Sequence, residues 1–133
     1  MDQPFYDNLG KLMLRLTVGG LMLFHGISKI GNDAALSWIS GHLAGVGLPG
    51  FLAYAVFIGE IIAPVMIVAG TACRAGAVLL IVNMLVAIGL AHSDDIFSLG
   101  NTGGWELELQ GFYLFGAAAI VLFGSGRYAF NPD

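Results

Sequence analysis

Four long apolar runs, separated by short polar segments, dominate the order of residues along this chain. They cover Gly10–Ile30, Phe51–Gly70, Arg74–Ala91 and Leu107–Phe123. Each run is close to the roughly 20 residues that a helix needs to cross the hydrocarbon core of a bilayer. The pattern therefore predicts an all-α membrane protein, with four transmembrane helices bundled into a single domain over residues 1–133.

The segment between the first two runs predicts an additional short helix. Asn32 or Asp33 offers an N-cap, an apolar stretch follows over residues 36–43, and residues 47–50 form a Gly-Leu-Pro-Gly turn. A helix of this kind lies in the membrane interface, and we expect Trp38 to sit at the level of the lipid headgroups.

Composition supports the membrane class. Of the 133 residues, 57% are hydrophobic and 11% are charged, whereas soluble domains carry about 25% charged residues. The net charge of −4, with scattered basic residues, argues against a nucleic-acid partner. The single cysteine, Cys73, excludes an internal disulfide and a Cys-x-x-Cys pair, so we expect a small buried or turn residue there.

The basic residues predict an orientation. Four of the five fall on one side of the predicted bundle, namely Lys11, Arg15, Arg74 and Arg127. The opposite side carries most of the acidic residues and a single basic residue, Lys29. The positive-inside rule then places both termini in the cytoplasm, and we expect a multi-pass protein of the bacterial inner membrane. The first run has no small-residue cleavage site, so we expect it to be retained rather than removed as a signal peptide.

Glu60 lies at the centre of the second apolar run, which is otherwise uncharged. An ionisable group at mid-membrane depth costs several kcal/mol and marks a functional site by default. Pro64, four positions later, removes the N–H that would have bonded the carbonyl of Glu60. Neither the carboxyl group nor this freed carbonyl can face lipid without a hydrogen-bond partner. Groups in the interior of the bundle must therefore bind both.

One face of the first predicted helix collects its charged and small residues. At steps of three and four positions, this stripe contains Arg15, Gly19, Met22, Gly26 and Lys29. The two charges can either snorkel to the membrane surfaces or bind inside the bundle. His25, beside the stripe, is too short to snorkel easily and needs an interior partner.

Two partners for Glu60 are open on the sequence alone. By helical rise, His25 lies about 6 Å nearer the outer surface than Glu60 does. Arg15 lies at a comparable distance from Glu60 on the inner side. An Arg15–Glu60 bridge would be structural. A His25–Glu60 pair would suit proton transfer, so we name Glu60 and His25 as the candidate catalytic residues.

The last two predicted helices add further polar side chains to the interior. Asn83 lies near mid-depth on a stripe with Gly76, Leu80 and Ala87, while Glu106, Gln110, Tyr113 and Ala117 follow one another at helical spacing. His92 could join His25, Gln110 and Glu106 around an outward-facing vestibule. No pair has the spacing of a known metal motif, so no metal is predicted. The candidate ligand-binding residues are Arg15, Lys29, Asn83, His92, Gln110 and Tyr113.

The order of these features resembles the DoxX family of small four-helix bacterial membrane proteins. The matching stretches are Leu14-Arg15-Leu16, His25-Gly26 with Lys29, Gly47-Leu48-Pro49, Glu60, Gly70-Thr71 with Arg74, Met84 with Ala87 and His92, and Gly124-Ser125-Gly126-Arg127-Tyr128. The chain departs from the family pattern at Pro64 and at its ending, which reads Gly-Ser-Gly and then Ala129-Phe130-Asn131 rather than Gly-Pro-Gly with a later Ser-Leu-Asp.

The resemblance implies a function linked to redox chemistry, because better-studied relatives are associated with quinone-linked sulfur oxidation and with redox-stress complexes. We expect a non-autonomous membrane subunit whose polar pocket around Glu60 binds a quinone-like or other small amphiphile. The chain has no haem-ligand pattern, thiol pair or cluster motif, so a bound quinone, partner subunits or a homo-oligomer must complete the system. Two alternatives stay open, namely a proton-coupled solute or metal transport component and a non-catalytic membrane anchor or assembly factor.

Overall fold

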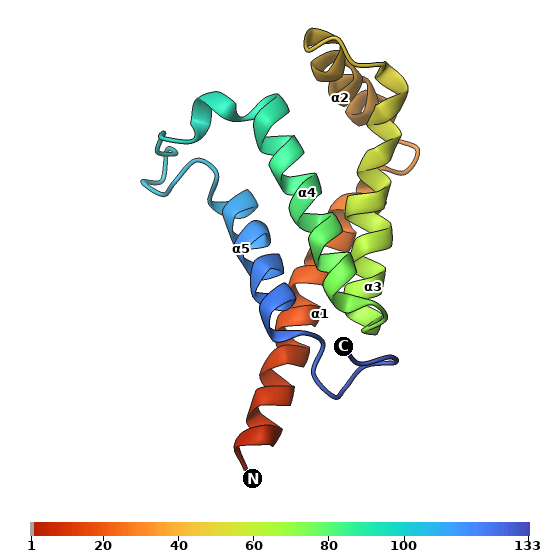
Figure 1. Ribbon diagram of the computed structural model, residues 1–133. Helices are drawn as coiled ribbons and strands as arrows, with labels where there is room; N and C mark the ends of the chain where they lie inside the picture. The colour runs from red at the N-terminus through yellow and green to blue at the C-terminus, as the bar shows by residue number, and fades with distance from the viewer. Residues whose placement is uncertain (1) are drawn as a thin grey trace.

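The computed structural model describes residues 2–133, and helices of several types account for nearly all of its regular structure (Figure 1). In chain order the α-helices are α1 (Gln3–Lys29), α2 (Asp33–Gly45), α3 (Ala63–Ala69), α4 (Cys73–Ala91) and α5 (Glu108–Phe123). Three shorter elements join them, namely η1 (Gly50–Ala55), η2 (Ile58–Ile62) and η3 (Ser93–Asp95). Within the described range no strand extends beyond an isolated bridge, so the all-α prediction is confirmed.

Among residues 2–133, two helical stretches are long and apolar enough to cross a membrane. They are Gly50–Ala69, of 20 residues, and Cys73–Ala91, of 19 residues. These correspond to the second and third of the four predicted spans. The fourth predicted span forms α5, which is apolar but has only 16 residues.

The first helix begins earlier than its apolar run. The side chain of Asp2 accepts a hydrogen bond of 3.1 Å from the backbone N–H of Phe5, and Pro4 occupies the first turn. A capping carboxylate and an early proline both favour a helix start. As a result α1 has 27 residues, about 40 Å at 1.5 Å per residue, and its N-terminal turns extend beyond the bundle (Figure 1).

The second apolar run is not the uniform helix that the sequence predicted. It starts as a 3₁₀ segment, η1, continues as a π-helical segment, η2, and becomes α-helical only in α3. Pro64 lies in the first turn of α3, and just before it the N–H of Ala63 donates to the carbonyl of Ile58, five residues back. The wider turn accompanies the proline, which cannot donate to Glu60.

The predicted short helix after the first run is confirmed as α2. The Asn32 side chain caps it by accepting a 3.1 Å hydrogen bond from the N–H of Ala35. Leu36 and Leu43 are buried against Ala53 of η1, so α2 packs mainly on the start of the next stretch. In Figure 1, α2 lies at the end of the bundle opposite the two chain termini.

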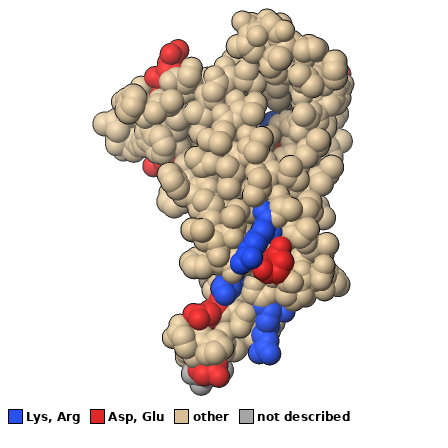
Figure 2. Space-filling model, in the orientation of Figure 1, with Lys and Arg blue, Asp and Glu red and all other residues tan. Residues whose placement is uncertain are grey.

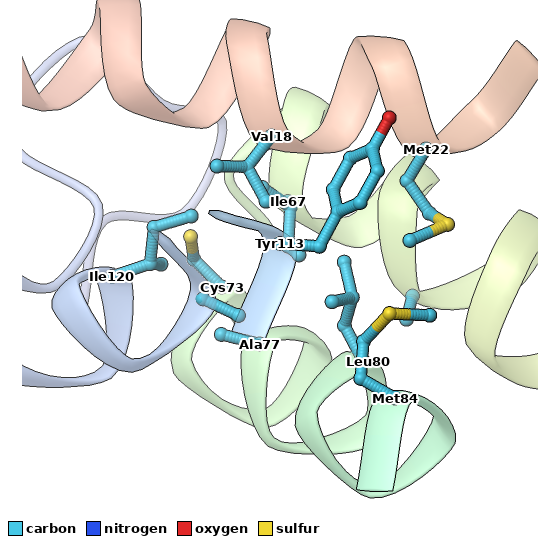
Figure 3. Close-up of a cluster of buried hydrophobic side chains, with 11 residues drawn as sticks. Val18, Met22, Ile67, Cys73, Ala77, Leu80, Met84, Tyr113 and Ile120 are labelled. Carbon is cyan, nitrogen blue, oxygen red and sulfur yellow. The ribbon is translucent and has the colours of Figure 1, made fainter. Parts of the chain in front are cut away.

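The core lies between α1, α3, α4 and α5 in the half of the bundle nearer the termini. Its buried members include Val18, Met22, Ala63, Ile67, Cys73, Ala77, Leu80, Met84, Tyr113, Ala117 and Ile120. Figure 3 shows these side chains meeting between the four helices. The face of α1 predicted to point inward is confirmed, since Arg15, Gly19, Met22 and Gly26 are all buried. Cys73 is buried at the first position of α4, as expected.

Arg15 ties the end of α3 to the C-terminal tail. It is 1% exposed, and its guanidinium donates to the carbonyls of Ile67 (2.9 Å), Val68 (2.9 Å), Ser125 (3.1 Å) and Tyr128 (2.7 Å). The expectations that Arg15 snorkels or bridges Glu60 are therefore wrong. The five donors of an arginine fork suit a cluster of carbonyls at a helix end. Of the four, the Ile67 carbonyl also accepts from the N–H of Gly70, at 3.2 Å.

The tail itself crosses the same end of the bundle. The N–H of Phe130 donates to Ala69 O and that of Asn131 donates to Gly70 O, each at 3.1 Å. Asp133 accepts from the N–H of Arg74 at 3.1 Å. These bonds hold the tail over the turn between α3 and α4.

Replacing Arg15 with methionine should destabilise the protein strongly. The substitution keeps most of the volume but leaves buried carbonyls without donors, at about 1–3 kcal/mol for each unsatisfied group. The exposed Arg127 provides the matched control, because its side chain makes no hydrogen bond to any of residues 2–133 and only its backbone N–H donates, to Asn8. Thermal unfolding in lipid nanodiscs should show a large loss for Arg15→Met and little change for Arg127→Met, and equal midpoints would contradict the clamp.

Candidate functional site

A cavity of about 440 Å³ lies at the end of the bundle away from the termini. Its walls come from α1, α2, the 50–62 stretch, α4 and α5. In Figure 2 the upper half of the molecule is hollowed, and a basic side chain is visible inside the opening. The volume falls within the range of about 300–1,000 Å³ that small-molecule pockets occupy.

Glu60 and Lys29 form a close ion pair at the floor of this cavity. The Nζ of Lys29 lies 2.6 Å from Oε1 of Glu60, and Glu60 is only 6% exposed. The other carboxylate oxygen faces Asn83, whose Nδ2 donates to Oε2 at 3.5 Å. Lys29 also reaches the carbonyl of His25 at 3.4 Å. Thus three elements, α1, η2 and α4, each contribute one side chain to a connected network.

The partner of Glu60 is therefore Lys29 rather than His25 or Arg15. Helical rise gives the depths of Cα atoms, whereas the side chains of a helix lean toward its N-terminus. The long side chain of Lys29 points back toward the middle of the bundle. It thereby covers the difference in depth between Lys29 and Glu60. Lys29 accordingly does not snorkel to the surface, and the ion pair satisfies both charges internally.

Two glycines allow the backbone and side chains of the network to approach closely. A Cβ on Gly26 of α1 would overlap the carbonyl oxygen of Glu60, the group that Pro64 leaves without its usual donor. A Cβ on Gly59 would overlap the side chain of Asn83. Small residues at these two contacts bring α1 and α4 onto either side of η2, as small residues do between membrane helices.

His25 and Tyr113 meet at the same cavity. Their rings lie 5.7 Å apart at an interplanar angle of 90°, in an edge-to-face arrangement. Figure 3 shows the Tyr113 ring rising from α5 with its hydroxyl oxygen beside α1. Aromatic pairs favour this geometry, which holds the imidazole and the phenol in the region of the ion pair.

The structure brings seven of the eight candidate site residues to one cavity. Its lining includes His25, Lys29, Glu60, Asn83, His92, Gln110 and Tyr113. Arg15 lies elsewhere, in the carbonyl clamp at the opposite end. Glu106 also lies outside the cavity, because α5 begins only at Glu108 and Glu106 is exposed in the preceding turn.

Two residues of α2 line the cavity that sequence reasoning did not place there. Trp38 and His42 have ring centroids 4.2 Å apart, and Nδ1 of His42 lies 2.9 Å from the carbonyl of Trp38. The sequence predicts Trp38 at the headgroups and indicates no role for His42. The available signal was their spacing of four residues, which places both on one face of a helix.

The cavity combines a polar floor with largely apolar walls. Lys29 and Asn83 supply hydrogen-bond donors, Glu60 supplies an acceptor, and His25, Gln110 and Tyr113 add groups that can both donate and accept. Within residues 2–133 no group of three or more His, Cys, Asp or Glu side chains is arranged to hold a metal ion. The arrangement is suited to a small ligand with a polar head and an apolar body, and to proton exchange near that head.

Comparison with known proteins gives the family. The profile of the DoxX family matches residues 10–93, which is more than half of the chain. The chain belongs to the DoxX family. A protein of Bacillus subtilis (strain 168) named "Putative oxidoreductase CatD" is 32% identical over 133 residues, covering 99% of this chain and 90% of the relative. No solved structure matches this DoxX protein. The family and this relative point to a membrane protein associated with redox chemistry.

Enlarging Gly26 should disturb the site more than enlarging a neighbouring glycine. Gly26→Ala would force α1 away from the backbone of Glu60, and overpacking of this kind costs about 1–3 kcal/mol. Gly20→Ala is the matched control on the same helix, because a Cβ there meets nothing within 4 Å. Thermal unfolding should show a lower midpoint for Gly26→Ala only, and a parent-like Gly26→Ala would contradict the close contact.

Proposed function

We propose that this DoxX protein is a small integral membrane subunit of a quinone-linked redox complex, and that its cavity binds a quinone-like headgroup at the Glu60–Lys29 pair. The observation that carries the proposal is a hydrogen-bonded ion pair, with Glu60 buried and Lys29 partly buried, at the floor of an apolar cavity. Intramembrane ion pairs that face a cavity are a common feature of ligand and proton sites.

The lining residues fit a quinone in two respects. A quinone ring carries carbonyl oxygens that accept hydrogen bonds, and Lys29, Asn83 and Tyr113 can donate them. The apolar walls, which include Leu52, Val82 and several other aliphatic side chains, suit a hydrophobic ring and tail. A bound quinone supplies the electron chemistry that the chain's own side chains lack.

The chain's own residues would handle protons. Glu60 is close enough to Lys29 to exchange a proton directly at 2.6 Å. The amide of Asn83 lies beside the second carboxylate oxygen, with Nδ2 at 3.5 Å. The His25 ring, which lines the cavity and packs on Tyr113, would pass protons between the floor and the rest of the cavity.

The proposed topology has four membrane-spanning helices, with α1 and α5 as the first and last and both termini in the cytoplasm. Figure 1 supports it in part, because the two termini lie at the same end of the bundle. In Figure 2 the surface basic side chains gather toward that end, as the positive-inside rule requires of a cytoplasmic side. We place the protein in the bacterial inner membrane, with redox subunits or further copies of the chain as partners.

One observation favours a second candidate function, a proton-coupled transport component. The 50–69 stretch changes from 3₁₀ to π to α geometry beside Glu60 and Pro64, and interrupted helices at mid-membrane are frequent in transporters. Flux of a candidate solute into vesicles that contain the protein alone would favour transport. Its absence, together with a co-purified quinone, would favour the redox subunit.

Replacing Glu60 with glutamine should impair proton-linked turnover. The substitution keeps the shape of the side chain but removes the group that exchanges a proton with Lys29, and loss of a positioned acid–base group lowers rates about 10²–10⁴-fold. The measurement is quinone-dependent electron transfer in membranes that contain the protein with its native partners. Glu106→Gln is the matched control, because Glu106 is exposed and outside the cavity.

Quinone binding should be followed separately. Trp38 lines the cavity, so a short-chain quinone should quench its fluorescence in the purified protein. Parent-like turnover of Glu60→Gln would refute the proton role, whereas absence of any quenching in the parent would refute the quinone site. Native extraction in lipid and mass spectrometry of co-purifying molecules would identify the ligand and partners directly.

A further inference from the structure

We propose that the cavity around Glu60 exchanges protons and ligand with only one side of the bundle, the side that carries α2 and the loop between α4 and α5. The opposite end, where the two termini lie, is closed. This inference rests on the proposed function only for the identity of the ligand that enters the cavity. The packing that closes the opposite end involves no ligand.

The first barrier is the apolar core directly beneath the ion pair. Met22, Met84 and Tyr113 belong both to the cavity lining and to the core cluster, so the floor of the cavity is the top of the core. Below them Ile67, Ala77 and Leu80 are completely buried. Figure 3 shows these side chains filling the space between α1, α3, α4 and α5. A close-packed apolar layer gives water no polar partners and stays dry.

The second barrier is the carbonyl clamp of Arg15. Its guanidinium lies between α1, the end of α3 and the tail, with bonds to four carbonyls. Ser125 of the tail is completely buried and accepts from the N–H of Asp133 at 2.9 Å. A path from the terminal end would have to break this clamp before it reached the apolar core.

A second hollow near the clamp does not connect with the cavity. It has a volume of about 570 Å³ and is lined by Arg15, Leu23, Val68, Tyr128, Phe130 and a few neighbours. None of its lining residues also lines the cavity around Glu60. The two hollows are therefore separated by protein.

The open end, in contrast, is lined by groups that transfer protons. All three histidines of the chain, His25, His42 and His92, line the cavity. His42 and His92 are half-buried, and Nδ1 of His92 lies 3.3 Å from Oδ2 of Asp95 in the outer turn. Because His42 belongs to α2 and His92 follows the end of α4, these side chains line the cavity between Glu60 and the outer solution. In the proposed topology that solution is the periplasm.

A cysteine at position 87 tests the access route. Ala87 lines the cavity one helical turn beyond Asn83 on α4. Purified protein with a C-terminal tag is reconstituted in vesicles, and the accessibility of the tag reports which side faces out. We expect a membrane-impermeant sulfonated maleimide to label Ala87→Cys at least tenfold faster when it is added on the side opposite the tag.

Two controls share the same helix. The native Cys73 and an Ala77→Cys variant are both completely buried in the core and should react with the reagent only after unfolding in detergent. If Ala77→Cys does not fold, Cys73 in the parent chain serves as the same control. Labelling of Ala87→Cys from the side of the tag, equal labelling from both sides, or no labelling from either side would each overturn one-sided access.

Protection of Ala87→Cys by a short-chain quinone separates this inference from the proposed function. One-sided labelling that quinone slows supports both. One-sided labelling that quinone leaves unchanged would count against the quinone site alone, because the reagent would still have entered by the predicted route.

Discussion

The ion pair between the buried Glu60 and the partly buried Lys29 is the constraint on which the rest of the site depends. Separating the charges in an apolar interior would leave each without compensation, so the bundle must hold α1 and the 50–69 stretch in a register that joins them. At 2.6 Å the pair neutralises both groups while leaving the carboxylate's second oxygen to Asn83. The cavity is therefore polar at its floor without carrying a net charge there, which favours polar but uncharged ligand heads.

The neighbouring backbone is adapted to this pair. Pro64 leaves the Glu60 carbonyl without its usual donor, and the chain adopts a π-helical turn just before Pro64. Gly26 has no side chain, which lets α1 pack closely against this carbonyl. At the other end Arg15 satisfies the carbonyls where α3 stops and fastens the C-terminal tail. One end of the bundle is thus sealed by packing and hydrogen bonds, while the other keeps a cavity open under α2.

Much of this arrangement could be predicted from sequence, because helical periodicity determines which side chains share a face. The inward stripe on α1 and most of the cavity residues follow from that periodicity. Three features could not be predicted. The choice of Lys29 as partner depends on the reach and direction of a long side chain, and the role of Arg15 depends on a tail more than 100 residues away in sequence. The place of His42 depends on α2 forming a wall of the cavity, whereas the sequence predicts a helix on the membrane surface there.

The central claim, that Glu60 and Lys29 act as one unit, is tested most directly by a double-mutant cycle on unfolding free energy in lipid nanodiscs. Glu60→Gln and Lys29→Met are measured singly and together. The account predicts that the double variant is less destabilised than the sum of the single variants by at least about 1 kcal/mol, as expected for residues in one buried network. Additive effects would show that the two side chains contribute independently and would contradict the account.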